Sequence, residues 1–262
     1  MRFPAFLILI ITTLIGLGCN KVNVFSLERD KELGAQVNAE ILANPAQYPV
    51  LPERGNEEVY RYIRGITSTL LNSGKVKNKD EFAWEVRIIN DDATLNAFAT
   101  PGGYIYVYTG LIKYLDSEEQ LAGVMGHEIA HADLRHSTKA LTKQYGLSVL
   151  LQAATVGAGA GAGQLGEIAA GLTTLSFGRA AETEADSYSV VYMCPTSYEA
   201  DGAADFFIKL DASSNGERPP AFLSTHPNPG NRVTNIQEQA KELGCTGTAT
   251  NKAAYDRIKA ML

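Results

Sequence analysis

The sequence lacks the features of several common classes of protein. It has no excess of positive charge, because 23 Lys and Arg residues stand against 29 Asp and Glu residues and the formal net charge is −6. Binding to nucleic-acid phosphates depends on basic surfaces, so nucleic acid is not an expected partner. No internal repeat of about 20 to 50 residues is found, which argues against a repeat-array domain. With 262 residues and 45% hydrophobic content, the chain can bury one sizeable core, and we expect a single domain.

The apolar run at the N-terminus is too short for a membrane-spanning helix. Residues 3–18 follow Arg2 and number fewer than the ~20 that such a helix needs, so residues 1–18 are predicted to be an export signal. The end of this run, Gly16-Leu17-Gly18-Cys19, resembles a lipobox, although Gly16 replaces the usual branched aliphatic residue. An ordinary cleaved signal is the alternative. We expect lipidated Cys19 and a tether over residues 19–26 to anchor the protein at a bacterial membrane, facing the periplasm.

Cysteine is scarce, with only three residues in the chain. If Cys19 is lipidated, Cys194 and Cys245 remain in an oxidising compartment where a disulfide can persist. We predict that these two form a bridge. Two small, buried, unpaired side chains are the alternative.

Hydrophobic periodicity predicts a mostly helical α+β domain over residues 27–262. Leu33, Val37 and Ile41 lie at helical spacing, as do Val59, Ile63, Ile66 and Leu70. Alternation over residues 82–89 and 104–109, with an extended candidate at 96–100, predicts a small mixed sheet of about three strands. Further helices are expected near residues 179–192, 198–210, 229–243 and 253–262. The glycine-rich run 157–163 is interpreted as a mobile hairpin or lid, with a membrane span as the poorer alternative.

The chemically informative motif is His127-Glu128-Ile129-Ala130-His131. Its two imidazoles are four residues apart on one face of a helix predicted to start near Asp116 or Ser117, so both can bind one metal ion. Glu128 can take a proton from metal-bound water. The helix is largely apolar, and burying these polar groups without a partner would be costly, whereas a metal ion supplies the partner. A solvated helix with chance histidines is the alternative.

A catalytic zinc ion needs a third protein ligand and an open position. Leu134 and Ser137 stand where the metzincin subclass needs Gly and His, which excludes that subclass. Glu182 and Asp186 share a helical face, so one can bind the metal while the other accepts the free N–H of a ligating histidine. Glu184 is expected to point away. Acids facing water are the alternative reading.

Four motifs in order carry a resemblance to a known family. They are Asn96-Ala97-Phe98 with Pro101-Gly102-Gly103, the helix 121–131 with His136, the run 179–186 (RAAETEAD), and Thr225-His226-Pro227 with Arg232. The chain resembles the HtpX, BepA and LoiP group of gluzincin-type zinc metallopeptidases, which are relatives of the CAAX prenyl proteases. The resemblance implies a zincin-like fold that binds one zinc ion per chain. It makes His127, His131 and Glu182 the zinc ligands, Glu128 the general base, and Asp186 the partner of a ligating histidine.

The resemblance also implies roles for three other regions. Asn96, Ala97 and Phe98 would form the edge strand along which an extended substrate lies, with Phe98 in the core of a strand-to-turn segment as the alternative. His226 and Arg232 would lie near the metal and stabilise the oxyanion, unless His226 occupies the open zinc position and keeps the enzyme latent. His136, five residues after His131, is interpreted as structural.

We therefore expect a lipid-anchored, zinc-dependent endopeptidase domain of the bacterial envelope, without membrane spans. It would cleave unfolded or misassembled envelope proteins through a zinc-bound water activated by Glu128. An edge strand pairs with any extended backbone, which favours unfolded substrates. A zinc-stabilised, largely latent chaperone or adaptor lipoprotein is the alternative, and a structural lipoprotein without metal is a third hypothesis. The sequence indicates neither the cleavage preference nor the oligomeric state.

Overall fold

The protein is described by a computed structural model over residues 23–143, 170–213, 221–227 and 230–262. The predicted signal peptide, Cys19 and the glycine-rich run 157–163 lie outside these ranges, so predictions about them stay predictions. Among the described residues, no helix is both long and apolar enough to cross a membrane.

A three-stranded mixed sheet forms the β part of the fold. Strand β1 (Glu85–Ile89) runs parallel to β3 (Tyr104–Tyr108), and β2 (Ala97–Thr100) runs antiparallel to β3. The strand order is β1-β3-β2, so β2 is an edge strand. The predicted fold class, mostly helical with a small mixed sheet of about three strands, is confirmed.

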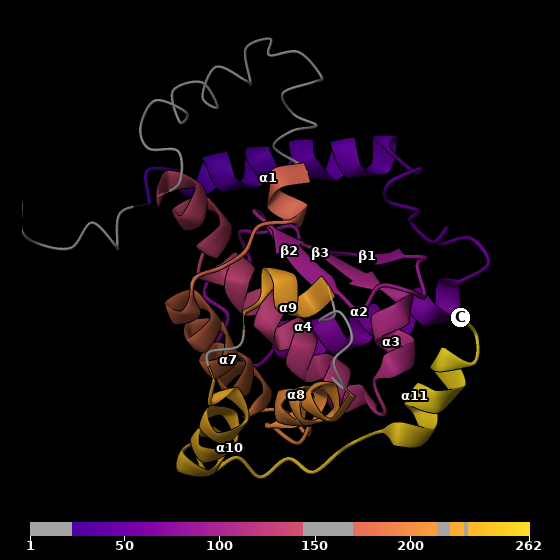
Figure 1. Cartoon of the computed structure of the whole chain (residues 1–262), viewed down its shortest axis with the longest axis vertical. Helices are drawn as coiled ribbons and strands as arrows, with labels where there is room; N and C mark the ends of the chain where they lie inside the picture. The colour runs from indigo at the N-terminus through magenta and orange to yellow at the C-terminus, as the bar shows by residue number, and fades with distance from the viewer. Residues whose placement is uncertain (1–22, 144–169, 214–220, 228–229) are drawn as a thin grey trace, which may run out of the picture.

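The two faces of the sheet pack against different helices. On one face, Phe98 and Tyr106 pack with α1 (Leu27–Ala43), which runs across the sheet in Figure 1. On the other face, the alternate residues of all three strands pack into the main core with α2 (Glu57–Leu71) and α4 (Glu118–Asp133). Residues of β2 that face α4 are Ala97 and Ala99. Their small side chains leave the histidine pair of α4 close to the edge strand.

Helix α4 is buried along its whole length and lies at the centre of a group of helices. It packs against α7 (Arg179–Met193) and α8 (Gly202–Ser213), and α10 (Arg232–Glu242) packs against both of these. Gly123 permits the contact with α8, because a Cβ there would lie 2.4 Å from the backbone nitrogen of Ala203. This packing fixes α7, and therefore its acidic residues, relative to α4.

Three short helices complete the labelled elements: α3 (Thr109–Tyr114), α9 (Ala221–Thr225) and α11 (Lys252–Lys259). Residues 136–143 and 170–173 are also helical. Neither α3 nor α9 was predicted, because both are too short to show a period in the sequence. The motif helix begins one residue after Ser117, in agreement with its predicted start.

Two predicted boundaries were wrong for local reasons. Strand β1 begins at Glu85 rather than Phe82, because Trp84 has a positive φ of 47° that interrupts the extended backbone. Helix α8 begins at Gly202 rather than Tyr198, because Tyr198 forms a β-bridge with Ala249 instead. The other predicted helices match the structure to within a few residues at their ends.

Cys194, directly after α7, and Cys245, shortly after α10, are joined by a disulfide with a Cα–Cα distance of 4.9 Å. Both partly buried side chains pack against the main core. The bridge ties the end of α7 to the chain that follows α10, and so reinforces the packing of these two helices.

Candidate metal centre

Helix α4 presents the two histidines of the motif side by side. His127 and His131 are 1% and 0% exposed, and their Nε2 atoms lie 2.9 Å apart. The four-residue spacing places both rings on one face, as the sequence predicts. Two buried ring nitrogens this close share one small space.

Helix α7 supplies a carboxylate to the same space. Glu182 is fully buried, with Oε2 3.4 Å from Nε2 of His127 and Oε1 3.4 Å from Nε2 of His131. Burial disfavours the charged carboxylate, but its contacts with the histidines outweigh this and hold the pKa of Glu182 far below its usual value. Glu182 is therefore an anion at any ordinary pH.

Asp186, one turn after Glu182, lies behind the first histidine. Its Oδ1 is 2.8 Å from Nδ1 of His127, the ring nitrogen that points away from the shared space. Burial acts to lower the pKa of His127, but Asp186 and Glu182 together raise it to about 9 in the metal-free chain. His131, without such a carboxylate behind it, has its pKa lowered well below the usual value by burial.

Arg232, at the start of α10, holds both carboxylates in place. Its Nε donates to Oδ2 of Asp186 and its Nη2 to Oε2 of Glu182, each at 2.6 Å, and the side chain is 1% exposed. The guanidinium also lies over the ring of Phe207, 4.2 Å from its centre. These two contacts show that Arg232 orients the acids, and the oxyanion role that the resemblance suggested stays a prediction. Its Nη1 has no hydrogen-bond partner among the described residues.

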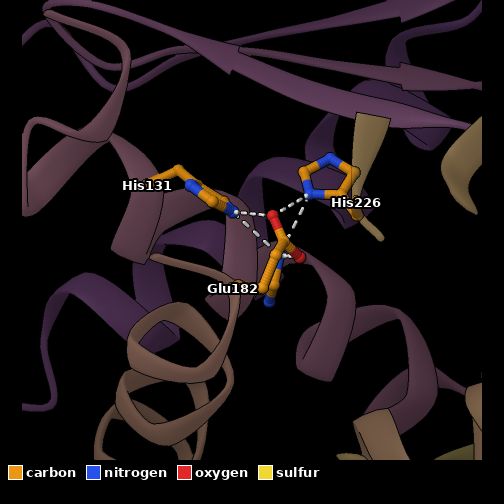
Figure 2. A group of neighbouring side chains, drawn as sticks. His131, Glu182 and His226 are labelled. Carbon is orange, nitrogen blue, oxygen red and sulfur yellow. Dashed lines mark hydrogen bonds and ion pairs between the residues drawn. The ribbon is translucent and has the colours of Figure 1, made fainter. Parts of the chain in front are cut away.

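His226 joins the cluster from the segment that follows α9. Its Nδ1 lies 3.2 Å from Nε2 of His127 and 3.1 Å from Oε1 of Glu182. Figure 2 shows the Glu182 carboxylate between the rings of His131 and His226. Of the two roles that the resemblance allowed for His226, this position fits the occupied fourth ligand position better than an oxyanion donor.

The four side chains fit a divalent metal ion. His127, His131, Glu182 and His226 each offer one ligand atom, and these atoms lie within 4.8 Å of one another. Ligands about 2.0–2.1 Å from a tetrahedral zinc ion are separated by about 3.3 Å, which is close to the distances observed here. Hydrogen bonds alone satisfy such a group poorly, because several lone pairs point at one place. Three imidazoles and one carboxylate form a donor set that suits zinc.

Glu128 lies beside this cluster and is 1% exposed. Its Oε1 is 3.5 Å from Nε2 of His226 and has no hydrogen-bond partner among the described residues, while its carboxylate accepts a hydrogen bond from the backbone of Ala99. Burial raises the pKa of Glu128, and the nearby His226 and His127 reduce this rise. A raised pKa suits a group that must accept and then release a proton.

The edge strand β2 passes directly in front of Glu128. The carbonyl of Asn96 accepts from the backbone of Tyr108 in β3, so the backbone groups of Ala97 and Ala99 face the free edge. There the Ala97 N–H donates to the Asn96 side chain and the Ala99 N–H to Glu128. Phe98 points to the opposite face and stacks on Tyr106 with ring centres 4.7 Å apart. The side chain of Phe98 thus belongs to the core, while the strand's backbone edge faces the site.

His136 is not a member of the cluster, yet it touches it. Its Nδ1 lies 2.9 Å from Nδ1 of His131, and its Nε2 lies 3.2 Å from Oε2 of Glu184. Glu184 points away from the converging atoms, as the sequence predicts. The interpretation of His136 as merely structural missed this contact. Burial lowers the pKa of His136 to about 4, against the opposing effect of Glu184.

Two aromatic rings that sequence reasoning missed also line the cluster. Phe177 stacks on His131 with ring centres 4.0 Å apart, and Phe222 stacks on His226 at 4.4 Å. Neither residue belongs to a motif with fixed spacing from the histidines. No signal in a single sequence could have identified them.

Comparison with known proteins places this geometry in a family. The sequence matches the model of peptidase family M48 over residues 57–240. The chain belongs to peptidase family M48. The matched M48 region runs from α2 into α10 and includes all four cluster residues, with Glu128, Asp186 and Arg232.

The chain is similar to proteins named as bacterial and mitochondrial peptidases. The chain is 31% identical to the beta-barrel assembly-enhancing protease of Yersinia pestis over 205 residues, which cover 73% of this chain and 41% of that protein. It is 33% identical to the Escherichia coli protein of the same name over 169 residues, or 60% and 34% of the two chains. It is 29% identical to the mitochondrial metalloendopeptidase OMA1 of Schizosaccharomyces pombe over 226 residues, or 85% and 64%. The chain thus spans between about a third and two thirds of these relatives.

Proposed function

We propose that the protein is a zinc-dependent endopeptidase in which His127, His131 and Glu182 hold the metal ion. One observation carries this proposal: buried nitrogen and oxygen atoms from separate helices converge on a single space, with Glu128 beside it. Membership of family M48 supports the same conclusion. A bound zinc ion would act as a Lewis acid and lower the pKa of water at the site.

The residues of the chain supply the proton transfer and the orientation. Glu128 takes a proton from the attacking water and later delivers it to the leaving amine, a role favoured by its raised pKa. Asp186 and Arg232 keep His127 and Glu182 oriented. The edge of β2 at Ala97 and Ala99 would bind the backbone of an extended peptide once the side chains of Asn96 and Glu128 release the N–H groups of these residues. Because backbone pairing ignores side-chain identity, unfolded chains are the substrates that this edge suits best.

The cellular setting is part of the proposal. The Yersinia pestis and Escherichia coli relatives carry the name beta-barrel assembly-enhancing protease, which supports unfolded or misassembled envelope proteins as substrates of this chain. We propose that residues 1–18 are an export signal and that lipidated Cys19 anchors the protein in the envelope, facing the periplasm. Mass spectrometry of membrane fractions would test the anchor: unlipidated protein with an intact or absent Cys19 would contradict it.

Metal analysis combined with casein cleavage tests the enzymatic proposal. The native chain should contain about one zinc ion and cleave casein, while Glu128→Gln should keep the zinc and lose at least ~100-fold in activity. Glu238→Gln, a change of an exposed glutamate on α10, is the matched control and should behave like the native chain. Native protein without metal would refute the zinc centre, and full activity of Glu128→Gln would refute the role of Glu128.

A second candidate function is a largely latent chaperone or adaptor. The observation that favours it is the position of His226 in the cluster, together with the hydrogen bond from the Phe222 N–H of α9 to the carbonyl of Leu95 just before β2. Both contacts occupy places that a substrate would use. A Glu128→Gln variant that still replaces the native protein in living cells would favour this candidate, and loss of function would favour the peptidase.

A further inference from the structure

The two histidines of the motif are backed by different chemical groups. The outward Nδ1 of His127 faces an aspartate, whereas the outward Nδ1 of His131 faces another imidazole nitrogen, on His136, at 2.9 Å. His136 is 4% exposed, and its second nitrogen lies 3.2 Å from Oε2 of Glu184. A row of three side chains thus leads from the cluster to the surface, and the proposed catalytic cycle leaves two of them, His136 and Glu184, without a role.

A break in the helix brings His136 back to its neighbour. On a continuous helix, residues five apart are about 140° from each other around the axis and do not touch. Here α4 ends at Asp133, and Arg135 takes a positive φ of 60° before helical structure resumes at residue 136. Arg135 is held in this conformation by Asp30, whose Oδ2 accepts from its Nε at 2.5 Å. The hydrogen bond with Asp30 offsets the conformational cost of the positive φ at Arg135. The resulting turn places the His136 ring against His131.

The direction of each hydrogen bond follows from the position of the cluster. If Nε2 of His131 gives its lone pair to a metal ion, its proton resides on Nδ1 and must be donated outward. Nδ1 of His136 can accept it only if His136 carries its own proton on Nε2. That second proton is directed at Glu184, a carboxylate that accepts. The three side chains therefore form one consistent sequence of donors and acceptors.

We infer that His136 is a positioning residue for the metal ligand His131, and that Glu184 orients His136 in turn. The inference rests on the proposed metal centre. Through this contact His136 fixes which nitrogen of His131 is free for the metal and how the ring is turned, while Phe177 stacks on the face of the same ring. Outer contacts of this kind typically contribute 10- to 100-fold to metal affinity.

The test measures zinc affinity by chelator competition in the full chain. His136→Phe keeps the ring volume but removes the acceptor, and should weaken zinc binding about 10- to 100-fold. His136→Asn keeps an acceptor near the Nδ1 position and should restore affinity to within about threefold of the native chain. The absorption spectrum of the cobalt-substituted chain should shift in His136→Phe and remain native-like in His136→Asn, which a purely structural role would not produce.

Glu184 provides an independent arm, because its side chain is 48% exposed and its replacement does not threaten folding. Glu184→Leu should weaken zinc binding about threefold or more, whereas Glu184→Gln, which keeps an acceptor oxygen, and the exposed control Glu238→Leu should not. Native-like zinc affinity of both His136→Phe and Glu184→Leu would overturn the inference. So would equal losses in His136→Phe and His136→Asn. If the native chain itself bound no zinc, the proposed function would fail first, and this inference with it.

Discussion

The cluster is reached from two sides of the molecule that are built differently. On the side of α4 and α7, His127, His131 and Glu182 come from helices of 16 and 15 residues and are each backed by a further polar side chain. On the other side, His226 follows a helix of five residues. Its Nε2 has no hydrogen-bond partner among the described residues, and the ring packs on Phe222. The three proposed ligands of α4 and α7 are thus each held by a second polar side chain, whereas His226 is held by ring stacking and by the contacts of its Nδ1 within the cluster.

The difference has an energetic origin. Glu182, Asp186 and Arg232 bury charges that stabilise one another, because losing any one of them leaves a desolvated partner with an unmet hydrogen bond. Ring stacking at His226 tolerates displacement, since an imidazole leaving the cluster can be rehydrated. We therefore expect changes on the α4–α7 side to disrupt metal binding or stability, and changes at His226 to leave both largely intact.

Removal of the buried carboxylate should have the largest effect. Glu182→Gln replaces the one carboxylate among the four converging side chains by a neutral amide, which binds zinc poorly, so the purified chain should hold far less than one zinc ion and show no casein cleavage. Metal content after dialysis measures this directly. Retention of a full equivalent of zinc would show that Glu182 is not a ligand.

Replacement of Arg232, which bonds both Glu182 and Asp186, should have the next largest effect. Arg232→Leu leaves the buried carboxylates of Glu182 and Asp186 without their guanidinium partner and should lower the free energy of unfolding by about 3–5 kcal/mol in urea titrations of the metal-free chain. Lys252→Leu, which breaks an exposed ion pair with Asp256, is the control and should cost no more than about 0.5 kcal/mol. Equal losses in the free energy of unfolding for the two variants would contradict a stabilising role for the buried contacts of Arg232.

The disulfide should stabilise the packing of α7 and α10 without changing the affinity for zinc. It closes a loop of 51 residues, so replacing Cys194 and Cys245 together by Ala should lower the free energy of unfolding by about 2–4 kcal/mol. Zinc affinity of the folded double variant should stay native-like, because neither cysteine belongs to the four-residue cluster. A variant that unfolds at the native urea midpoint would show that the bridge adds no stability.

Zinc binding should also depend on pH in a defined direction. In the metal-free chain the carboxylates raise the pKa of His127 to about 9, so the metal must displace its proton at neutral pH. Affinity should therefore fall as pH falls, by up to about tenfold per unit between roughly pH 9 and pH 6. Calorimetry in buffers of different ionisation enthalpy should detect about one proton released per zinc ion. Affinity that is flat over this range would contradict a protonated His127.

The sequence predicted those parts of the site that lie on one regular element. The four-residue spacings of His127 with His131, and of Glu182 with Asp186, are enough to place each pair on a helical face. Helical spacing alone was not enough where the chain leaves a helix, and only the family resemblance placed His226 and Arg232 near the metal. The approach of His136 to His131 depends on the positive φ of Arg135, and the entry of His226 depends on α9, which is too short to leave a periodic pattern. The contacts of Arg232 with both Glu182 and Asp186 depend on how α10 packs on α7, which cannot be deduced from residue spacing along the sequence.

The smallest effect on metal binding is expected for replacement of His226. His226→Ala removes one ring from the cluster but leaves His127, His131 and Glu182 with all their supporting contacts, so zinc affinity should change by less than about tenfold. Because the His226 ring occupies space in front of Glu128, casein cleavage should become faster in this variant. Phe222→Ala should act in the same direction on cleavage by removing the ring stacked on His226, although its burial makes the protein less stable. Slower cleavage by His226→Ala with native zinc content would indicate that His226 takes part directly in the reaction. Loss of zinc would indicate that His226 is as important for metal binding as His127, His131 and Glu182.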